Sequence, residues 1–137
     1  NRVIATTDDV MRQLSSLQDQ LRRGNRGANQ AVLTEFEGTL KDMKHFRDSV
    51  LARPLPGLGY RQYPRLREEV QTVTGMVLRP MLPVTAGERL RSTELRSETD
   101  GAQARLDGII RDRVGKINDL LKDAPHVVVP PAPRPVP

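Results

Sequence analysis

Residues 85–124, TAGERLRSTELRSETDGAQARLDGIIRDRVGKINDLLKDA, decide the fold of this chain. Thr85 and Glu88 form a Ser/Thr-x-x-Glu capping box, in which each side chain satisfies a free backbone N–H at the start of a helix. No proline follows before Pro125. Aliphatic residues recur along one arc: Leu95, Ala102, Leu106, Ile109, Ile110, Val114, Ile117, Leu120 and Leu121. The pattern predicts one amphipathic helix over 86–124, about 55 Å long at about 1.5 Å per residue.

Three shorter helices are expected before it, over 4–23, 29–52 and 64–79, because apolar residues recur there at steps of three and four. Their stripes are Val10, Leu14, Leu17 and Leu21 in the first, Val32, Phe36, Leu40, Met43, Phe46 and Val50 in the second, and Leu66, Val70, Val73 and Val77 in the third. Gly24 and Gly27 are expected to end the first helix, and Pro54 the second. Pro64 suits the first position of the third, which Pro80 closes.

These elements predict an all-α fold, an antiparallel four-helix bundle with a short third and a long fourth helix. The bundle is expected over 1–124, followed by an extended proline-rich tail over 125–137. Residues 53–63 predict an irregular crossover. Because the fourth helix is about twice as long as the third, it must bend or overhang. Gly101 is the favoured place for a bend.

Composition excludes several classes of function. The chain of 137 residues has 22 Lys and Arg, 17 Asp and Glu, and neither cysteine nor tryptophan, which excludes disulfides and thiolate metal sites. The basic residues alternate with acidic ones instead of forming a stripe, so no nucleic-acid partner is expected. No apolar window is long enough to span a membrane, and no stretch has the signal-peptide pattern. A first residue Asn1 is expected of a piece of a longer protein.

The sequence also shows no set of residues at a spacing typical of a catalytic site. His45 and His126 have no second ligand at a metal-binding spacing. Glu35 with Glu37, and Glu68 with Glu69, resemble paired carboxylates, but close neighbours on a helix diverge instead of converging on one point. We therefore expect no enzyme activity, no metal and no cofactor in this chain.

Residues 60–130 resemble the C-terminal helical region of bacterial secreted proteins built on sortilin-like, BNR-repeat β-propellers, often named glycosyl-hydrolase-like. The resemblance rests on Tyr63, Pro64, Leu66, Val73, Gly75, Val77, Pro83, Val84, Thr85, Glu88 and Leu95, then on Leu106 to Ile117, Asn118, Leu120 and Leu121, and on the ending Val127, Val128, Val129 and Pro130. It implies an extracytoplasmic location and a propeller N-terminal to this chain. It brings no catalytic residue onto these positions.

One repeated feature predicts a contact surface. Gly101, Gly108 and Gly115 recur every seven residues, and at about 100° per residue they face away from the apolar arc. Each costs about 0.5–1 kcal/mol of helix stability relative to alanine, so their recurrence needs a reason. Two explanations need no function: an exposed surface that tolerates any small residue, or a fourth helix that packs against other helices on both sides. The functional hypothesis is a docking face edged by Arg105, Asp112 and Asp119.

The favoured function is therefore a non-catalytic helical accessory module that packs on another domain, or subunit, of a secreted β-propeller protein. The alternative is a free-standing extracytoplasmic helical binding protein or sensor domain. Such a protein should carry polar groups inside its stripes, whereas the stripes here are almost purely aliphatic.

Overall fold

The computed structural model describes residues 2–24, 30–55 and 62–121, and these ranges contain helices and turns but no β-strand. In chain order the elements are α1 (Arg2–Gly24), α2 (Gln30–Phe46), the π-helical turn η1 (Arg47–Leu51), α3 (Leu66–Val77), α4 (Ala86–Ile109), the π-helical turn η3 (Ile110–Val114) and α5 (Gly115–Leu121). The all-α prediction is confirmed, including the short third helix. The long fourth helix is the line formed by α4, η3 and α5. The predicted tail over 125–137 lies outside the described residues.

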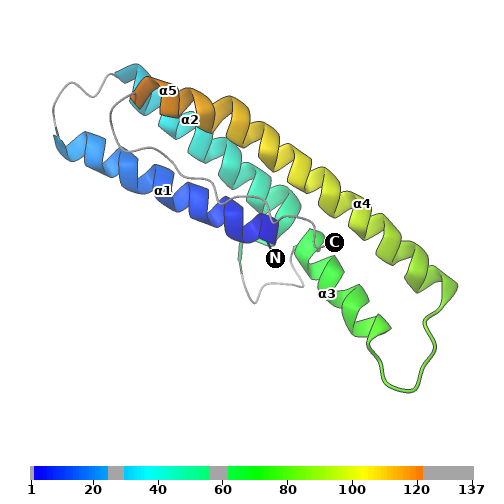
Figure 1. The fold of residues 1–137 in the computed structure, drawn as a ribbon. Coiled ribbons are helices and arrows are strands. Elements are labelled where there is room, and N and C mark those ends of the chain that lie inside the picture. Colours follow the sequence, from blue (N-terminus) through cyan, green and yellow to red (C-terminus); the bar gives the residue numbers. More distant parts are fainter. Residues whose placement is uncertain (1, 25–29, 56–61, 122–137) are drawn as a thin grey trace.

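The helices form two antiparallel hairpins, α1 with α2 and α3 with α4 (Figure 1). At one end of the molecule α1, α2 and the C-terminal half of the long helix lie side by side. At the other end α3 and the first half of α4 continue past the start of α1. The long helix therefore overhangs. The expected bend at Gly101 is not found, because α4 stays α-helical through that residue.

The core belongs to the end where three helices meet. Its fully buried large side chains come from α1, α2 with η1, and the long helix: Val10, Leu14, Phe36, Met43, Phe46, Leu51, Leu106, Val114 and Ile117. Each such side chain contributes about 1.5–3 kcal/mol through removal from water. The stripe predicted for the third helix is only partly covered: Leu66 packs against the core, but α3 contains no buried residue and Val70 is 38% exposed.

Two π-helical turns keep core residues on the core side. Val114 follows Leu106 by eight residues, which at about 100° per residue would place it about 80° from Leu106. The wider turn η3 rotates less per residue, and Val114 is buried. The turn η1 does the same for Leu51, five residues after Phe46. The second helix, predicted as one α-helix over 29–52, therefore changes geometry at Arg47; Asn29 lies outside the described residues.

The helix starts follow local hydrogen bonds. The capping box of α4 is confirmed, because Thr85 Oγ1 accepts from the Glu88 N–H at 3.2 Å and Glu88 Oε2 accepts from the Thr85 N–H at 2.8 Å. The third helix begins at Leu66 and not at Pro64, with Arg65 in extended geometry as its N-cap. Glu68 Oε2 accepts from the Arg65 N–H at 3.0 Å, which fixes this start.

Candidate docking surfaces

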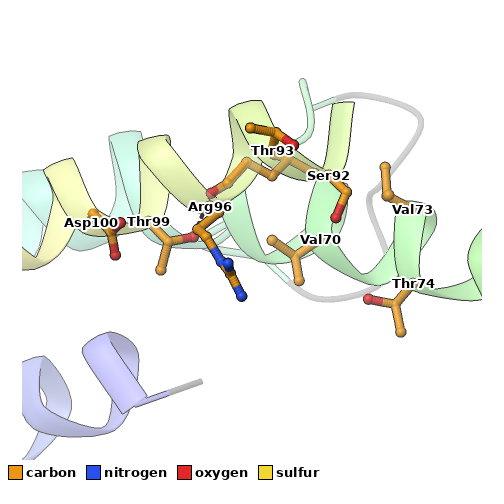
Figure 2. A pocket seen from close by; sticks show the side chains of 9 residues that line it. Val70, Val73, Thr74, Ser92, Thr93, Arg96, Thr99 and Asp100 are labelled. Carbon is orange, nitrogen blue, oxygen red and sulfur yellow. Dashed lines mark hydrogen bonds between the residues drawn. The ribbon is translucent and has the colours of Figure 1, made fainter. Parts of the chain in front are cut away.

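A groove runs between α3 and α4 and reaches the start of α1. Figure 2 shows its first part, a hollow of about 570 Å³ between Val70, Val73 and Thr74 of α3 and Ser92, Arg96 and Thr99 of α4. A second hollow of about 520 Å³ shares Val70, Thr74 and Thr99 with the first, and it reaches Val3 and Ile4 at the start of α1. Leu66 and Leu78 also line it. We call the two together the hairpin groove.

The two edges of the hairpin differ in charge. On the edge opposite the groove, Arg91 donates to Glu69 of α3 and, at 3.0 and 2.9 Å, to Glu94 and Glu98 of its own helix. These hydrogen bonds, with Glu69 contributing most, raise the pKa of Arg91 above its ordinary value. On the groove edge, Arg96 and Asp100 of α4 both line the first hollow and are exposed, and neither makes an ion pair within the described ranges. The groove edge therefore carries one charge of each sign at these two positions.

The other helix boundaries are bridged by ion pairs. Arg47 of η1 donates to Asp8 of α1 at 2.5 Å, which raises the pKa of Arg47. Further along the bundle, Arg22 donates to Glu37 at 2.7 Å. The long helix is joined to α2 by Arg113 with Asp42 and by Lys116 with Glu35, both at 2.6 Å, and the hydrogen bond from Lys116 lowers the pKa of Glu35. Among the described residues, ion pairs thus join α1 to η1, α1 to α2, and α2 to the long helix.

Large apolar side chains are exposed where the hairpin ends. Met76 is 44% exposed, Met81 100%, Leu82 58% and Leu90 62%. Met81 also has a φ of 72°, a left-handed conformation that non-glycine residues adopt infrequently. We call these four residues the hairpin tip. Scattered exposed leucines are ordinary, but several within one short projecting end are typical of an interaction site.

The predicted glycine face has open space around it in the described structure. A Cβ at Gly101 would meet nothing within 4 Å, and one at Gly108 would meet only the Arg111 side chain at 4.0 Å. A Cβ at Gly115 would lie 3.9 Å from the Ile110 carbonyl oxygen. Because η3 separates Gly115 from the other two, the constant rotation assumed in placing the three glycines on one line does not apply across it. The docking role of this face stays a prediction.

The residues predicted to edge the glycine face have separate surroundings. Arg105 lies over the ring of the buried Phe46, 5.1 Å from its centroid, so its side chain is turned toward α2. Asp112 accepts from Arg111 at 2.9 Å, and this bond raises the pKa of Arg111. Asp119 is exposed on α5. The structure therefore does not bring these three side chains together.

The acidic neighbours considered for catalysis are engaged elsewhere. Glu35 and Glu37 bind cations on different helices, Lys116 and Arg22. Glu68 accepts from the N–H groups of Arg53 and Arg65, whereas Glu69 binds Arg91. In the described ranges no three His, Cys, Asp or Glu side chains cluster as a metal site would require. His45 is exposed on α2, and His126 lies outside those ranges.

Three buried polar residues were missed by the apolar patterns. Thr7 and Thr39 are fully buried and Gln18 is 7% exposed. The spacing of Thr7 between Val3 and Val10 follows the same steps of four and three as the apolar residues, so that position was identifiable. The hairpin groove was missed because no pattern within one helix shows where another helix begins.

No family model, curated protein or solved structure matches the chain. Among the helices that the structure describes, none is long and apolar enough to cross a membrane.

Proposed function

We propose that this chain is a non-catalytic helical accessory module of an extracytoplasmic protein, and that it docks on another domain of that protein through the hairpin tip. The observation that carries the proposal is the exposure of Met76, Met81, Leu82 and Leu90 at the end of a projecting hairpin. Removing such side chains from water on contact is favourable by about 25 cal/mol per Å². The tip is the described feature best suited to that contact.

The division of the molecule supports this role. The three-helix end holds almost all the buried apolar side chains, so it is able to anchor a hairpin that has little core of its own. The partner domain, a sortilin-like β-propeller, is proposed from the resemblance of residues 60–130 alone. The extracytoplasmic location has the same basis.

The gene provides the first test. The reading frame upstream of the codon for Asn1 is expected to encode repeated propeller blades. A start codon preceded only by a short signal peptide would favour the free-standing binding protein instead.

Association of the two parts provides the second test. The encoded upstream domain, expressed separately, is expected to bind this chain, and the double substitution Met81→Asp and Leu82→Asp is expected to weaken binding by tenfold or more, about 1.4 kcal/mol. Asp19→Arg on the exposed side of α1 is the matched control and should leave binding unchanged. Unchanged binding by the tip variant with intact helical circular dichroism would reject the tip as the contact. Clear hydrolysis of aryl glycosides by the purified chain would reject the non-catalytic role.

A further inference from the structure

We propose that the chain preceding α1 continues that helix and fills the hairpin groove, so that a third helix of the same protein covers α3 and the first half of α4. The inference rests on the proposed function for the presence of further chain N-terminal to Asn1, and it specifies the segment that joins the two parts. It does not depend on the hairpin tip. The groove residues that carry it are Leu66, Val70, Thr74 and Leu78 of α3 with Thr99 of α4.

The groove begins where α1 begins. Val3 and Ile4, in the first turn of α1, line its second hollow together with Thr99 of α4. Val3 is only 8% exposed, so the turn that borders the groove is already packed in the core. In Figure 1, α3 and the first half of α4 extend beyond this turn, away from the three-helix end. A helix that continued α1 backward would therefore lie along the groove.

The groove has the length and the shape of a site for a helix. Its α3 wall is a line of residues four apart, Leu66, Val70, Thr74 and Leu78, which spans about 18 Å, the length of about twelve helical residues. Val70 is 38% exposed and Leu78 73% exposed, so the wall has apolar surface left to cover. A Cβ added at Gly75, on the same wall, would meet nothing within 4 Å, so a neighbouring helix has room to approach.

The charges at the groove edge do not favour a charged partner. Arg96 and Asp100 both line the first hollow, and neither makes an ion pair in the described ranges. One charge of each sign leaves the edge neutral at these positions, so burial of apolar surface has to provide the stabilisation. A segment of the same chain also avoids most of the translational and rotational entropy that a separate partner loses on binding. A continuation of α1 is therefore better suited to the groove than a separate molecule.

The register of α1 specifies which preceding residues should be apolar. The buried residues Val3, Thr7, Val10 and Leu14 follow one another at steps of four, three and four. Two helical turns take about seven residues, so counting back from Thr7 and Val3 places the first, fifth and eighth residues before Asn1 on the same side of the helix. We expect apolar residues there. We also expect neither proline nor glycine within about twelve residues before Asn1, because both weaken or interrupt a helix.

The test compares two lengths of the natural chain. One protein starts at Asn1, and the longer one starts about fifteen codons earlier in the gene, which adds slightly more than the length of the groove. In urea unfolding followed by circular dichroism, the longer protein is expected to have an unfolding equilibrium constant at least about tenfold smaller, a difference of about 1.4 kcal/mol. Amides of α3 are expected to exchange with solvent at least about tenfold more slowly in the longer protein, because the added helix holds α3 in place.

Two substitutions on α3 locate the added helix. Thr74→Arg places a long charged side chain on the groove wall. It is expected to raise the unfolding equilibrium constant of the longer protein by about tenfold or more, and to change the shorter protein little, because Thr74 is exposed there. Thr72→Arg is the matched control, since it is the same substitution at an exposed position of the same helix that lines neither hollow. Its effect should be small and equal in the two proteins.

Two results would overturn the proposal: a longer protein with unchanged stability and unchanged exchange in α3, or a Thr74→Arg effect that is equal at both lengths. Sedimentation adds a third. A dimer that Thr74→Arg dissociates, and that persists in the longer protein, would place a second copy in the groove instead.

The gene distinguishes failure of this proposal from failure of the proposed function. Propeller blades joined to Asn1 by a proline- or glycine-rich linker would reject the continuing helix and leave the accessory module standing. A signal peptide followed by a helical stretch with the expected apolar positions would support the continuing helix and reject the propeller. A frame with too few residues before Asn1 to fill the groove, and no blades, would reject both.

Discussion

Two buried threonines occupy the core with different hydrogen bonding. Thr7 donates its hydroxyl to the Val3 carbonyl oxygen at 2.7 Å, so its polar atom is satisfied within α1. Thr39 is equally buried, but its hydroxyl has no partner among the described residues. A buried hydroxyl without a hydrogen bond costs about 1–3 kcal/mol. The side chain of Thr39 is therefore a local weakness in α2.

Thr39→Val is expected to raise the free energy of unfolding by about 1 kcal/mol, because valine keeps the shape and removes the unsatisfied hydroxyl. Thr7→Val is the matched control; it removes a hydroxyl that is hydrogen-bonded and should be neutral or destabilising. Urea unfolding followed by circular dichroism measures both. A Thr39→Val protein that is less stable than the wild type would show that the hydroxyl is satisfied in solution.

Glu68 joins the crossover to α3 through its carboxylate. It accepts from the Arg53 N–H at 3.2 Å, from the Arg65 N–H at 3.0 Å and from the Arg67 side chain at 3.0 Å. Burial alone would raise the pKa of Glu68, but these hydrogen bonds outweigh it and hold the pKa below its ordinary value. The ionised form is thus stabilised by folding.

A lowered pKa in the folded state makes stability depend on pH in a defined direction. The contribution of Glu68 is present above the unfolded pKa of about 4.3 and is lost as pH falls through the folded pKa. The free energies of unfolding of wild type and Glu68→Gln should therefore differ most above about pH 5 and converge in more acidic solution. Urea unfolding from neutral pH down to acid measures this difference. For Glu37→Gln, at an exposed ion pair, only a small change is expected throughout. A constant difference for Glu68→Gln would contradict the assignment.

The π-helical turn η3 offsets a rotation that the residue spacing would otherwise produce along the long helix. Leu106, Ile110 and Val114 are separated by steps of four, which rotate progressively away from the core at about 100° per residue. The turn absorbs this rotation over Ile110–Val114. Arg111 and Asp112, which pair with each other, lie exposed on its outer side.

Deletion of Arg111 is expected to convert η3 into regular α-helix and to keep Val114 and Ile117 on the core side. The free energy of unfolding should change by less than about 1 kcal/mol, whereas deletion of the exposed Ala104 should cost about 3 kcal/mol or more, because it rotates Leu106 out of register. Thermal unfolding compares the two deletions. Equal destabilisation by both would show that the turn is not what maintains the register.

The elements could be predicted from the sequence to the extent that their signals are local. The capping box of Thr85 and Glu88 gave the start of α4 correctly, and the stripes of α1 and α2 supplied buried core residues such as Val10, Leu14, Phe36 and Met43. The turns η1 and η3 were not predicted, because an apolar pattern with steps of three and four still fits when one extra residue is inserted. The partial exposure of the α3 stripe could not be predicted, because periodicity shows which side is apolar and does not show what covers it.

At the scale of the whole molecule, the overhang divides the chain into a well-packed end and a projecting hairpin. In the first half of α4 only Leu95, 3% exposed, is buried, and α3 has no buried residue. The candidate surfaces could be predicted only in part for the same reason. A glycine face belongs to one helix and is visible in its sequence, whereas the hairpin groove depends on where α1 starts relative to two other helices.

Hydrogen exchange should show this division directly. Amides of α3 and of residues 86–97 are expected to exchange through local opening at a lower free energy than amides of α1, α2 and α5, because fewer buried contacts hold them. Exchange followed by mass spectrometry under native conditions resolves these segments. Uniform protection through both hairpins would mean that the chain unfolds as one unit.

The full exposure of Met81 makes the hairpin tip chemically addressable. Peroxide converts an accessible thioether to the sulfoxide, so dilute peroxide should modify Met81 first, Met76 more slowly and the fully buried Met43 last. Peptide mass spectrometry gives these rates residue by residue. Shielding of the Met81 sulfur in the intact parent protein would then mark the tip as covered, with no substitution needed.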